Sequence, residues 1–324
     1  MPEPKHVVVT GGAGFIGSHL VERLLADGHS VVVVDDCSTG RLENLQSVKA
    51  DPRLRVIVAK VSGCGAELPR LLADAASVYH LAAAVGVELV MKSPVHTLKT
   101  NLHETEVILE AACAHQVPIL LASTSEVYGK SQKAAFAEED DLLIGSPNFG
   151  RWSYACSKLM DEFLALAYAK EKKLPVVIAR LFNTVGPRQT GAYGMVLPRF
   201  IAAAKAGAPL LVFGDGSQTR CFCAVHDTVE ALIRLQNCPA ARGQIFNIGS
   251  TEEISIRELA ELVIQALGSK SEIQFVPYIQ AYSPEFEDML RRRPVTEKLF
   301  AITGLRPTTP LRTIIELTAK AFAK

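Results

Sequence analysis

The segment Thr10-Gly11-Gly12-Ala13-Gly14-Phe15-Ile16-Gly17 follows the β-branched run Val7–Val9 and opens a stretch of helical periodicity, Phe15–Ala26. Glycine is required there because the turn is tight and the backbone must approach a pyrophosphate closely. The helix N-terminus that follows offers free N–H groups and a partial positive charge to phosphates. Glycine spacing alone is weak evidence, but a strand before it and a helix after it indicate a dinucleotide-binding fold. The residues expected to bind the cofactor here are Gly11, Gly14, Phe15, Ile16 and Gly17.

Short β-branched runs alternate with longer segments of helical periodicity up to about residue 180. This alternation predicts right-handed crossovers and a parallel sheet. Strands that are apolar throughout fit such a sheet, because helices cover both of its faces. The predicted fold class is therefore α/β, a doubly wound parallel sheet (Rossmann) with a smaller α/β substrate-binding domain. The predicted strands are Val7–Val9, Val31–Val34, Val56–Ala59, Val78–Leu81, Ile119–Ala122 and Val176–Ala179, and the predicted helices include Phe15–Ala26, Leu98–His115 and Tyr154–Lys170.

The pattern changes after Arg180, where glycine and proline become dense. A length of 324 residues, at about 150 residues per domain, predicts two domains. We expect a cofactor-binding Rossmann domain over residues 1–180, rejoined by about residues 220–247, and a substrate domain over residues 181–324. The later region is predicted to contain helices at Val196–Ala206 and Ile256–Leu267, a strand and helix near Phe222–Leu235, and a final helix from Thr313.

Composition excludes several other classes of protein. The 34 lysines and arginines are balanced by 34 aspartates and glutamates, which argues against nucleic acid as a partner. No apolar stretch approaches the ~20 residues needed to cross a bilayer, and no signal-peptide pattern precedes Val7. The seven cysteines are odd in number and lack the spacing of a metal site. We therefore expect reduced thiols in a cytoplasmic protein that binds no metal.

The second predicted strand ends at Asp35-Asp36, which decides the type of dinucleotide. A carboxylate there can accept hydrogen bonds from the adenosine ribose diol and would repel a 2′-phosphate. Arg41, shortly after it, is a competing signal for NADP. We expect NAD, with Asp35 as the ribose contact, because the strand and the spacing after Gly17 agree.

Tyr154 and Lys158 stand at positions i and i+4 of a predicted helix, so a phenol and an ammonium share one face. A phenolate that acts near neutral pH needs its pKa lowered by about three units from ~10, or roughly 4 kcal/mol. One ammonium at ~4 Å in a partly screened site supplies about that much. A lone Tyr-x-x-x-Lys pattern is usually structural. Here it follows a glycine fingerprint and a strand that ends in Ser123–Glu126, so we expect it to be catalytic.

At these residues the sequence resembles the extended short-chain dehydrogenase/reductase family, specifically its nucleotide-sugar epimerases, dehydratases and decarboxylases. The resemblance covers essentially the whole chain. Its motifs are Thr10–Gly17, Tyr79–Ala83, Ser123–Gly129, Tyr154 with Lys158, Arg180–Arg188 and Gly214–Arg220.

The resemblance implies a tightly held NAD that oxidises the sugar at C4, after which the ketone is reduced again. It implies Tyr154 as the base, Lys158 as the group that holds the nicotinamide ribose and tunes Tyr154, and Thr124 as the partner of the reacting hydroxyl. The remaining implied cofactor contacts are Leu81, Ala82, Ala83 and Asn101. The candidate substrate contacts are Ser125, Asn183, Arg199, Arg220 and Arg292, among which the guanidinium groups suit phosphate and carboxylate.

The run Ser123–Gly129 looks like that of UDP-glucuronate decarboxylases, in which the residue matching Arg292 contacts the sugar. Oxidation at C4 would make a β-keto acid that loses carbon dioxide, and an acid such as Glu126 could reprotonate the enolate. Glu126 could also be a strand-end carboxylate without a catalytic part, and Arg291–Arg293 a solvated turn. We expect Thr124, Glu126, Tyr154, Lys158 and Arg292 to be catalytic, and UDP-glucuronate to be converted into UDP-xylose.

Two alternatives stay open. A nucleotide-sugar 4-epimerase would return hydride to the other face of the ketone, and the region Asp35–Arg41 looks as much like that of UDP-galactose 4-epimerases. A non-catalytic dinucleotide sensor is the other, although intact Thr124, Tyr154 and Lys158 count against it. Lys60 departs from the family, which often has an aspartate touching adenine there. The resemblance also implies a homodimer built on the helices near Leu98–His115 and Tyr154–Lys170.

Overall fold

A seven-stranded parallel sheet forms the centre of the computed structural model, which describes residues 5–85, 93–191, 195–277, 289 and 291–322. The parallel sheet confirms the predicted α/β class. Its strands are β1 (His6–Thr10), β2 (Val31–Asp35), β3 (Leu54–Val58), β4 (Ala75–His80), β5 (Ile119–Thr124), β6 (Val176–Leu181) and β11 (Gln244–Ile248). Their order across the sheet is β11-β6-β5-β4-β1-β2-β3.

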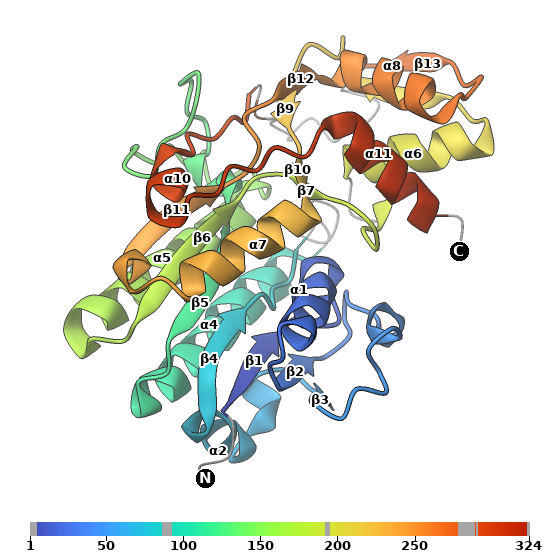
Figure 1. Ribbon diagram of the computed structural model, residues 1–324. Helices are drawn as coiled ribbons and strands as arrows, with labels where there is room; N and C mark the ends of the chain where they lie inside the picture. The colour runs from blue at the N-terminus through green and yellow to red at the C-terminus, as the bar shows by residue number, and fades with distance from the viewer. Residues whose placement is uncertain (1–4, 86–92, 192–194, 278–288, 290, 323–324) are drawn as a thin grey trace.

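Helices cover both faces of this sheet (Figure 1). One face packs against α1 (Phe15–Ala26) and α7 (Val225–Gln236), and the other against α2 (Glu67–Ala73), α4 (Pro94–His115) and α5 (Trp152–Lys172). Alternate strand residues enter separate cores, because successive side chains of a strand point to opposite faces. Val7 and Val9 lie in the core under α1 and α7, whereas Val8 lies in the core under α2, α4 and α5.

A second group of elements lies beyond the carboxyl ends of these strands, at the upper right of Figure 1. There α6 (Val196–Ala206), α8 (Ile256–Leu267) and α11 (Leu311–Ala321) pack together around a hydrophobic core. Two small sheets accompany them. β8 (Leu210–Phe213) pairs with β13 (Ile273–Val276), and β9 (Thr219–Cys221) pairs with β12 (Glu253–Ser255). A capping box between Ser255 and Glu258 starts α8.

The chain returns to the main sheet after passing through the second group. β11 pairs with β6, and α10 (Glu297–Thr303) packs against both β11 and α7. The strand predicted near Phe222 is β10 (Cys223–Ala224), which pairs with β7 (Thr184–Val185) and lies outside the main sheet. The strand that rejoins the main sheet is therefore β11, which follows α7 in the chain.

Several helices begin earlier than the periodicity predicted. α4 starts at Pro94 rather than Leu98, because proline suits the first turn of a helix. α5 starts at Trp152 and α11 at Leu311. The short 3₁₀ helices are η1 (Leu42–Leu45), η2 (Ser62–Cys64), η3 (Ser125–Tyr128) and η5 (Pro239–Ala241).

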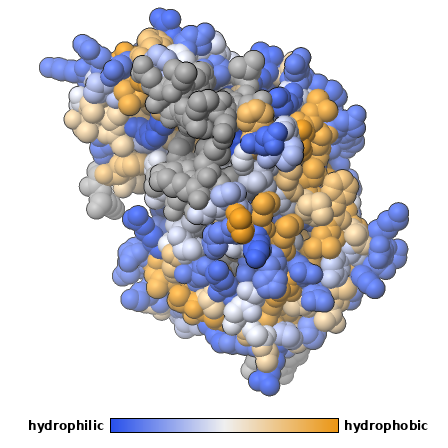
Figure 2. All heavy atoms as spheres, turned by 180° about the vertical axis from the view of Figure 1, so that it is seen from behind, coloured by the Kyte–Doolittle hydropathy of each residue, from blue (hydrophilic) through white to orange (hydrophobic). Residues whose placement is uncertain are grey.

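Large hydrophobic side chains remain exposed on α4 and α5. Val95 is 65% exposed, Met160 55% and Phe163 63%. Figure 2 shows the side of the molecule that faces away from the viewer in Figure 1, where hydrophobic side chains are exposed between charged ones. None of the helices in the described ranges has the length and hydropathy that crossing a membrane requires.

Candidate active site

A cavity of about 940 Å³ opens at the carboxyl ends of the main-sheet strands. This is where ligands bind in open α/β sheets. One wall comes from the loops after β1, β2, β4 and β5, and the other from α6, β8 and β9. Of the residues that the sequence singled out for cofactor, substrate or catalysis, all but Asn101 and Ser125 line this one cavity.

The loop between β1 and α1 makes a tight turn beside the cavity. Gly11 has a φ of +71°, and a Cβ at Gly11 would lie 2.7 Å from the backbone nitrogen of Ala82. A Cβ at Gly17 would lie 2.1 Å from the carbonyl oxygen of Gly11. A side chain at either position would push the turn apart. α1 then begins after Gly14 with no acidic residue in its first turn. This helix N-terminus suits a pyrophosphate.

Asp35, at the end of β2, holds this loop. Its Oδ2 accepts a hydrogen bond from Ala13 N and its Oδ1 one from Cys37 N, both at 2.8 Å. Burial raises the pKa of Asp35, whereas these N–H groups lower it. An ionised carboxylate has about four lone-pair sites, so Asp35 keeps hydrogen-bonding capacity for a ribose hydroxyl. Arg41 and Lys60 also line the cavity.

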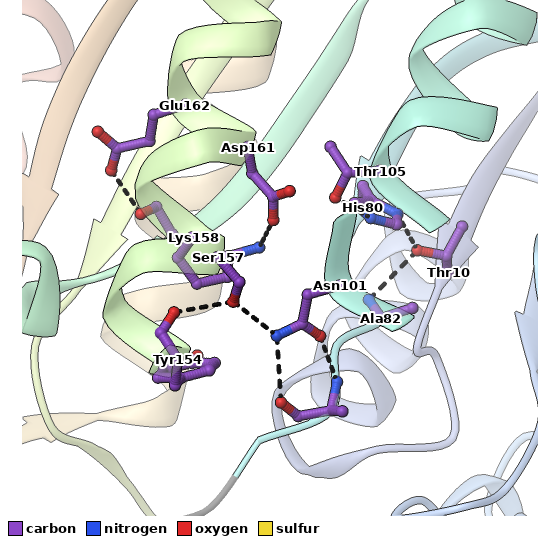
Figure 3. Close-up of polar contacts among 12 residues, drawn as sticks. Thr10, His80, Ala82, Asn101, Thr105, Tyr154, Ser157, Lys158, Asp161 and Glu162 are labelled. Atoms are coloured by element: carbon purple, nitrogen blue, oxygen red, sulfur yellow. Dashed lines mark hydrogen bonds and ion pairs between the residues drawn. The ribbon is translucent and has the colours of Figure 1, made fainter. Parts of the chain in front are cut away.

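Tyr154 and Lys158 project from neighbouring turns of α5 (Figure 3). Lys158 Nζ donates to Asp161 Oδ2 at 2.8 Å, and these side chains are 3% and 0% exposed. Tyr154 is half-buried and hydrogen-bonds with Thr124. Burial raises the pKa of Tyr154 above its ordinary value, and the carboxylates of Glu126 and Asp161 raise it further. The charge of Arg292 and the bond with Thr124 lower this pKa.

Asp161 changes the electrostatics that the sequence led us to expect. A lone ammonium beside the phenol would lower the pKa of Tyr154, but a carboxylate bonded to that ammonium offsets much of its field. Sequence reasoning missed Asp161. The signal was present, because an acid three residues after Lys158 faces it on a helix.

A network of hydrogen bonds joins α4, α5 and the loop after β4 (Figure 3). Asn101 Oδ1 accepts from Ala84 N at 2.8 Å, and Asn101 Nδ2 donates to Ser157 Oγ at 3.1 Å. Ser157 Oγ in turn donates to Tyr154 O at 2.9 Å. Asn101 is only 2% exposed. The structure thus places Asn101 behind the loop that carries Leu81–Ala84, where it fixes the shape of that wall.

His80 occupies a second buried network on the same side. Its Nδ1 lies 2.8 Å from Thr10 Oγ1, and its Nε2 lies 3.4 Å from Thr105 Oγ1. Burial lowers the pKa of His80 to about 3, so the ring is neutral at physiological pH. A buried neutral imidazole with two hydroxyl neighbours indicates a structural role for His80.

Glu126 and Arg292 meet across the cavity wall although 166 residues separate them in the chain. Glu126 lies in η3, and its backbone N–H donates to Thr124 Oγ1 at 3.2 Å. Arg292 Nη2 donates to Ser125 Oγ at 2.8 Å, and Arg292 Nη1 lies 3.5 Å from Glu126 Oε1. The Arg292 and Glu126 side chains are 11% and 15% exposed. Both contribute to the pKa of Tyr154, so three groups share one end of the cavity.

The remaining predicted side chains line the cavity from the segment after β6, which carries Asn183, and from α6 and β9, which carry Arg199 and Arg220. Asn183 Nδ2 donates to Cys221 O at 2.9 Å. Arg220, which is 8% exposed, donates from Nη1 to Thr219 O at 2.8 Å. The guanidinium of Arg199 lies 4.5 Å from the centre of the Phe213 ring, a cation–π distance. These arginines give the cavity positive charge although the chain as a whole has a net charge of zero.

The described residues contain no group of three or more His, Cys, Asp or Glu side chains placed to hold a metal ion. The side chains that line the cavity include a phenol, carboxylates, an ammonium and guanidinium groups, and they stand beside a glycine loop that suits a dinucleotide. A Rossmann sheet, a glycine loop and a Tyr154–Lys158 helix define a short-chain dehydrogenase/reductase of the extended type.

Within that class, the chain belongs to the GDP-mannose 4,6-dehydratase family, whose model matches residues 8–307. It is 41% identical over 305 residues to the UDP-N-acetyl-α-D-glucosaminuronate decarboxylase of Bacillus cytotoxicus, covering 94% of this chain and 93% of that protein. It is 36% identical over 320 residues to UDP-glucuronic acid decarboxylase 1 of Danio rerio, covering 99% of this chain and 73% of that protein. These findings confirm the resemblance to the nucleotide-sugar epimerases, dehydratases and decarboxylases.

A solved structure agrees with this placement. The UDP-glucuronic acid 4-epimerase of Bacillus cereus, in complex with UDP-glucuronic acid and NAD, superimposes with a TM-score of 0.88 at 28% sequence identity. The superposition covers 98% of this chain and 99% of that chain.

Proposed function

We propose that this protein is an NAD-dependent nucleotide-sugar decarboxylase that converts UDP-glucuronate into UDP-xylose through a 4-keto intermediate. The observation that carries the proposal is the contact of Arg292 with Ser125 and Glu126 at the end of the cavity that holds Tyr154. A guanidinium at that point suits the carboxylate of a uronic acid. Both the 41% identical and the 36% identical relative are decarboxylases of UDP-uronates, which supports a decarboxylation, and the 36% identical relative is named for UDP-glucuronic acid.

NAD is the cofactor in this proposal, and the residues present fit it. The glycine loop and the N-terminus of α1 receive the pyrophosphate, and Asp35 receives the adenosine ribose diol and repels a 2′-phosphate. Lys158 holds the nicotinamide ribose, beside the wall formed by Leu81, Ala82 and Ala83. NAD, when bound, accepts hydride from C4 of the sugar and later donates it back. The solved relative that contains NAD supports this assignment.

Tyr154 is the base for the first step. Its phenolate oxygen takes the proton of the C4 hydroxyl, and Thr124, which hydrogen-bonds with Tyr154, orients that hydroxyl. Arg220, Arg199 and Asn183 bind the diphosphate and sugar from the other wall. Tyr154 returns the proton to the C4 oxygen when the ketone is reduced again.

The middle step is the loss of the C6 carboxylate. A ketone at C4 makes the sugar a β-keto acid, so the electrons of the C5–C6 bond move toward the C4 oxygen as carbon dioxide leaves. Arg292 binds the carboxylate before it leaves. Glu126 then gives a proton to C5 of the resulting enolate, a transfer that is typically worth 10²–10⁴-fold in rate.

The product identifies the reaction. Incubation with UDP-glucuronate, followed by NMR, is expected to yield carbon dioxide and UDP-xylose. A 4-epimerase is the second candidate, favoured by the likeness to the Bacillus cereus epimerase. Formation of UDP-galacturonate without carbon dioxide would establish it and refute the decarboxylase. A parallel incubation with UDP-N-acetylglucosaminuronate tests the sugar named for the Bacillus cytotoxicus relative.

We also propose that the protein is a homodimer in which α4 and α5 of each subunit meet. α4 and α5 pack against each other, and large hydrophobic side chains are exposed on both: Val95 and Leu102 on α4, Met160 and Phe163 on α5. Exposed hydrophobic groups of this kind mark interaction sites. Phe163→Glu is expected to convert a dimer into a monomer in analytical ultracentrifugation, whereas Phe275→Glu, at a residue 47% exposed on β13, leaves the dimer intact. A monomeric wild type would refute this arrangement.

A cytoplasmic location belongs to the same proposal. All seven cysteines are free thiols. Reducing compartments keep thiols free, so this pattern favours the cytoplasm over an oxidising location. Fractionation of cells that express the protein at natural levels is expected to place it with cytoplasmic markers, and recovery with secreted proteins would contradict this.

A further inference from the structure

Asn247 on β11 is fully buried, and its side-chain amide and backbone N–H make hydrogen bonds outside the main sheet. Its Nδ2 donates to Phe136 O at 2.9 Å and to Val295 O at 3.3 Å. Its Oδ1 accepts from the hydroxyl of Tyr128 at 2.8 Å. Its backbone N–H donates to Glu138 Oε1 at 2.8 Å. Asn247 thus joins three segments that are far apart in the chain.

The orientation of this amide is fixed by its neighbours. The groups facing Nδ2 are two backbone carbonyls, which only accept hydrogen bonds, so the NH₂ end must point toward them. The oxygen end then faces Tyr128, whose hydroxyl must donate. Phe136 O also accepts from Val295 N at 2.8 Å, which completes its two lone pairs.

These bonds connect the two segments that carry Glu126 and Arg292. Tyr128 is the last residue of η3, the single turn that also contains Ser125 and Glu126. Val295 follows Arg292 in a segment that pairs with Phe136: Phe136 N donates to Arg293 O at 2.8 Å, and Pro294 forms a bridge with Phe136. The Asn247 side chain therefore bonds both to η3, which carries Glu126, and to the segment that carries Arg292.

Several buried contacts around Asn247 hold the Tyr128 ring in place. Arg180 makes a bidentate pair with Glu162, with its Nη2 donating to Glu162 Oε2 at 2.7 Å, and both side chains are 3% exposed. The same guanidinium stacks over the Tyr128 ring at 4.8 Å and donates to Glu138 O at 3.2 Å. Tyr128 also stacks on Phe136 with ring centres 4.8 Å apart. The ring of Tyr128 is thereby held even without its hydroxyl.

We propose that Asn247, together with the hydroxyl of Tyr128, is a positioning residue that sets Arg292 against Ser125 and Glu126, and so decides how tightly the cavity binds a sugar carboxylate. This inference rests on the proposed function. Recognition of the carboxylate then depends on a buried amide that does not line the cavity.

Tyr128→Phe is the conservative test, because it removes one hydroxyl and leaves both stacking contacts. Calorimetry is expected to show UDP-glucuronate bound about fivefold to tenfold more weakly, as loss of one buried hydrogen bond implies. The affinity for UDP, which has no carboxylate, stays within about twofold. Tyr79→Phe is the matched control, because Tyr79 is a buried tyrosine in the core under α1, and it leaves both affinities within about twofold.

A double-mutant cycle separates positioning from general weakening of the fold. In an Arg292→Ala background, Tyr128→Phe is expected to change UDP-glucuronate affinity by less than about twofold, because its effect passes through Arg292. Asn247→Asp, which places a carboxylate oxygen against two carbonyls, is expected to weaken UDP-glucuronate binding more than Tyr128→Phe. It too should leave UDP binding unchanged.

Three results would overturn the inference. The first is an equal loss of affinity for UDP and UDP-glucuronate. The second is an equal effect of Tyr128→Phe with and without Arg292. The third is no effect of Tyr128→Phe, or of Arg292→Ala, on UDP-glucuronate binding. These readouts are affinities, so they stand apart from the proposed reaction. A wild type that binds UDP-glucuronate but releases no carbon dioxide refutes the decarboxylase while the cycle still tests Asn247.

Discussion

Two charged pairs flank Tyr154, and they are built in opposite ways. Lys158 and Asp161 stand three residues apart on one helix and are buried almost completely, at 3% and 0% exposure. Arg292 and Glu126 stand 166 residues apart and keep 11% and 15% of their side chains exposed to the cavity. The first pair is fixed by helix geometry alone. The second exists only because the whole fold brings two segments together.

This difference separates stability from chemistry. A fully buried pair that is broken leaves an uncompensated charge in the interior, which costs folding free energy. A pair that borders a cavity is open to a substrate, and its groups can exchange one partner for another. We therefore expect Asp161 to matter mainly for folding, and Glu126 and Arg292 to matter mainly for the reaction.

The largest effect is expected at the residue between the pairs. Tyr154→Phe removes the proposed base and is expected to lower turnover of UDP-glucuronate by about 10³-fold or more, while NAD affinity stays within about twofold. Tyr168→Phe, farther along α5, serves as the control with unchanged turnover. Full activity of Tyr154→Phe in cells would favour a non-catalytic dinucleotide sensor.

Glu126→Ala tests the chemical side of the long-range pair. NAD is expected to stay bound, because Glu126 stands outside the glycine loop, but product formation falls by at least about 10²-fold through loss of the proton donor to C5. Glu139→Ala, which removes an exposed carboxylate, is the control. Wild-type turnover of Glu126→Ala would remove Glu126 from the mechanism.

Urea unfolding compares the two pairs directly. Asp161→Ala leaves Lys158 buried without its carboxylate and is expected to lower the free energy of unfolding by about 3–5 kcal/mol. Arg292→Ala is expected to lower it by only about 1 kcal/mol, because its site borders the cavity. Equal losses for the two variants would mean that both pairs serve the fold alike.

The smallest effect is a shift in pH dependence. The charge of Glu126 raises the pKa of Tyr154, and the charge of Arg292 lowers it. The base acts when deprotonated, so a lower pKa moves the rise in the rate of C4 oxidation to lower pH. Rapid-mixing measurements of nicotinamide reduction are expected to show this rise at lower pH in Glu126→Gln and at higher pH in Arg292→Gln. Shifts in the reverse directions would contradict these electrostatics.

Much of the cofactor-binding part of the cavity could be predicted from the sequence, because its sequence signals are local. The glycine loop, Asp35 and the Tyr154–Lys158 pair each depend on residues within one strand-turn-helix unit or one helix. Asp161 is equally local, because an acid three residues after Lys158 faces it on the helix, but the sequence analysis did not predict this pair. The strand-end position of Asp35 also did not reveal that its oxygens hold backbone N–H groups.

The substrate side was less predictable, because its contacts are long-range. The resemblance pointed to Glu126 and Arg292 separately, but no periodicity indicates that Arg292 bonds to Ser125. The part played by Asn247 depends on strand β11 pairing with β6 and on the chain crossing back over it at Val295. The strand predicted near Phe222 pairs with β7 rather than with the main sheet. The sequence did not indicate this partner, because strands that are far apart in the chain leave no local signal of their pairing.

The reaction proposed for this cavity removes the carboxylate of a UDP-uronate and returns a proton to C5. UDP-glucuronate labelled with ¹³C at C6 and incubated with the wild-type protein in D₂O tests it most directly. We expect the label to leave as ¹³CO₂ and the UDP-xylose formed to carry one deuterium at C5 in a single orientation. Label retained in a UDP-hexuronate, with the original hydrogen still at C5, would contradict it.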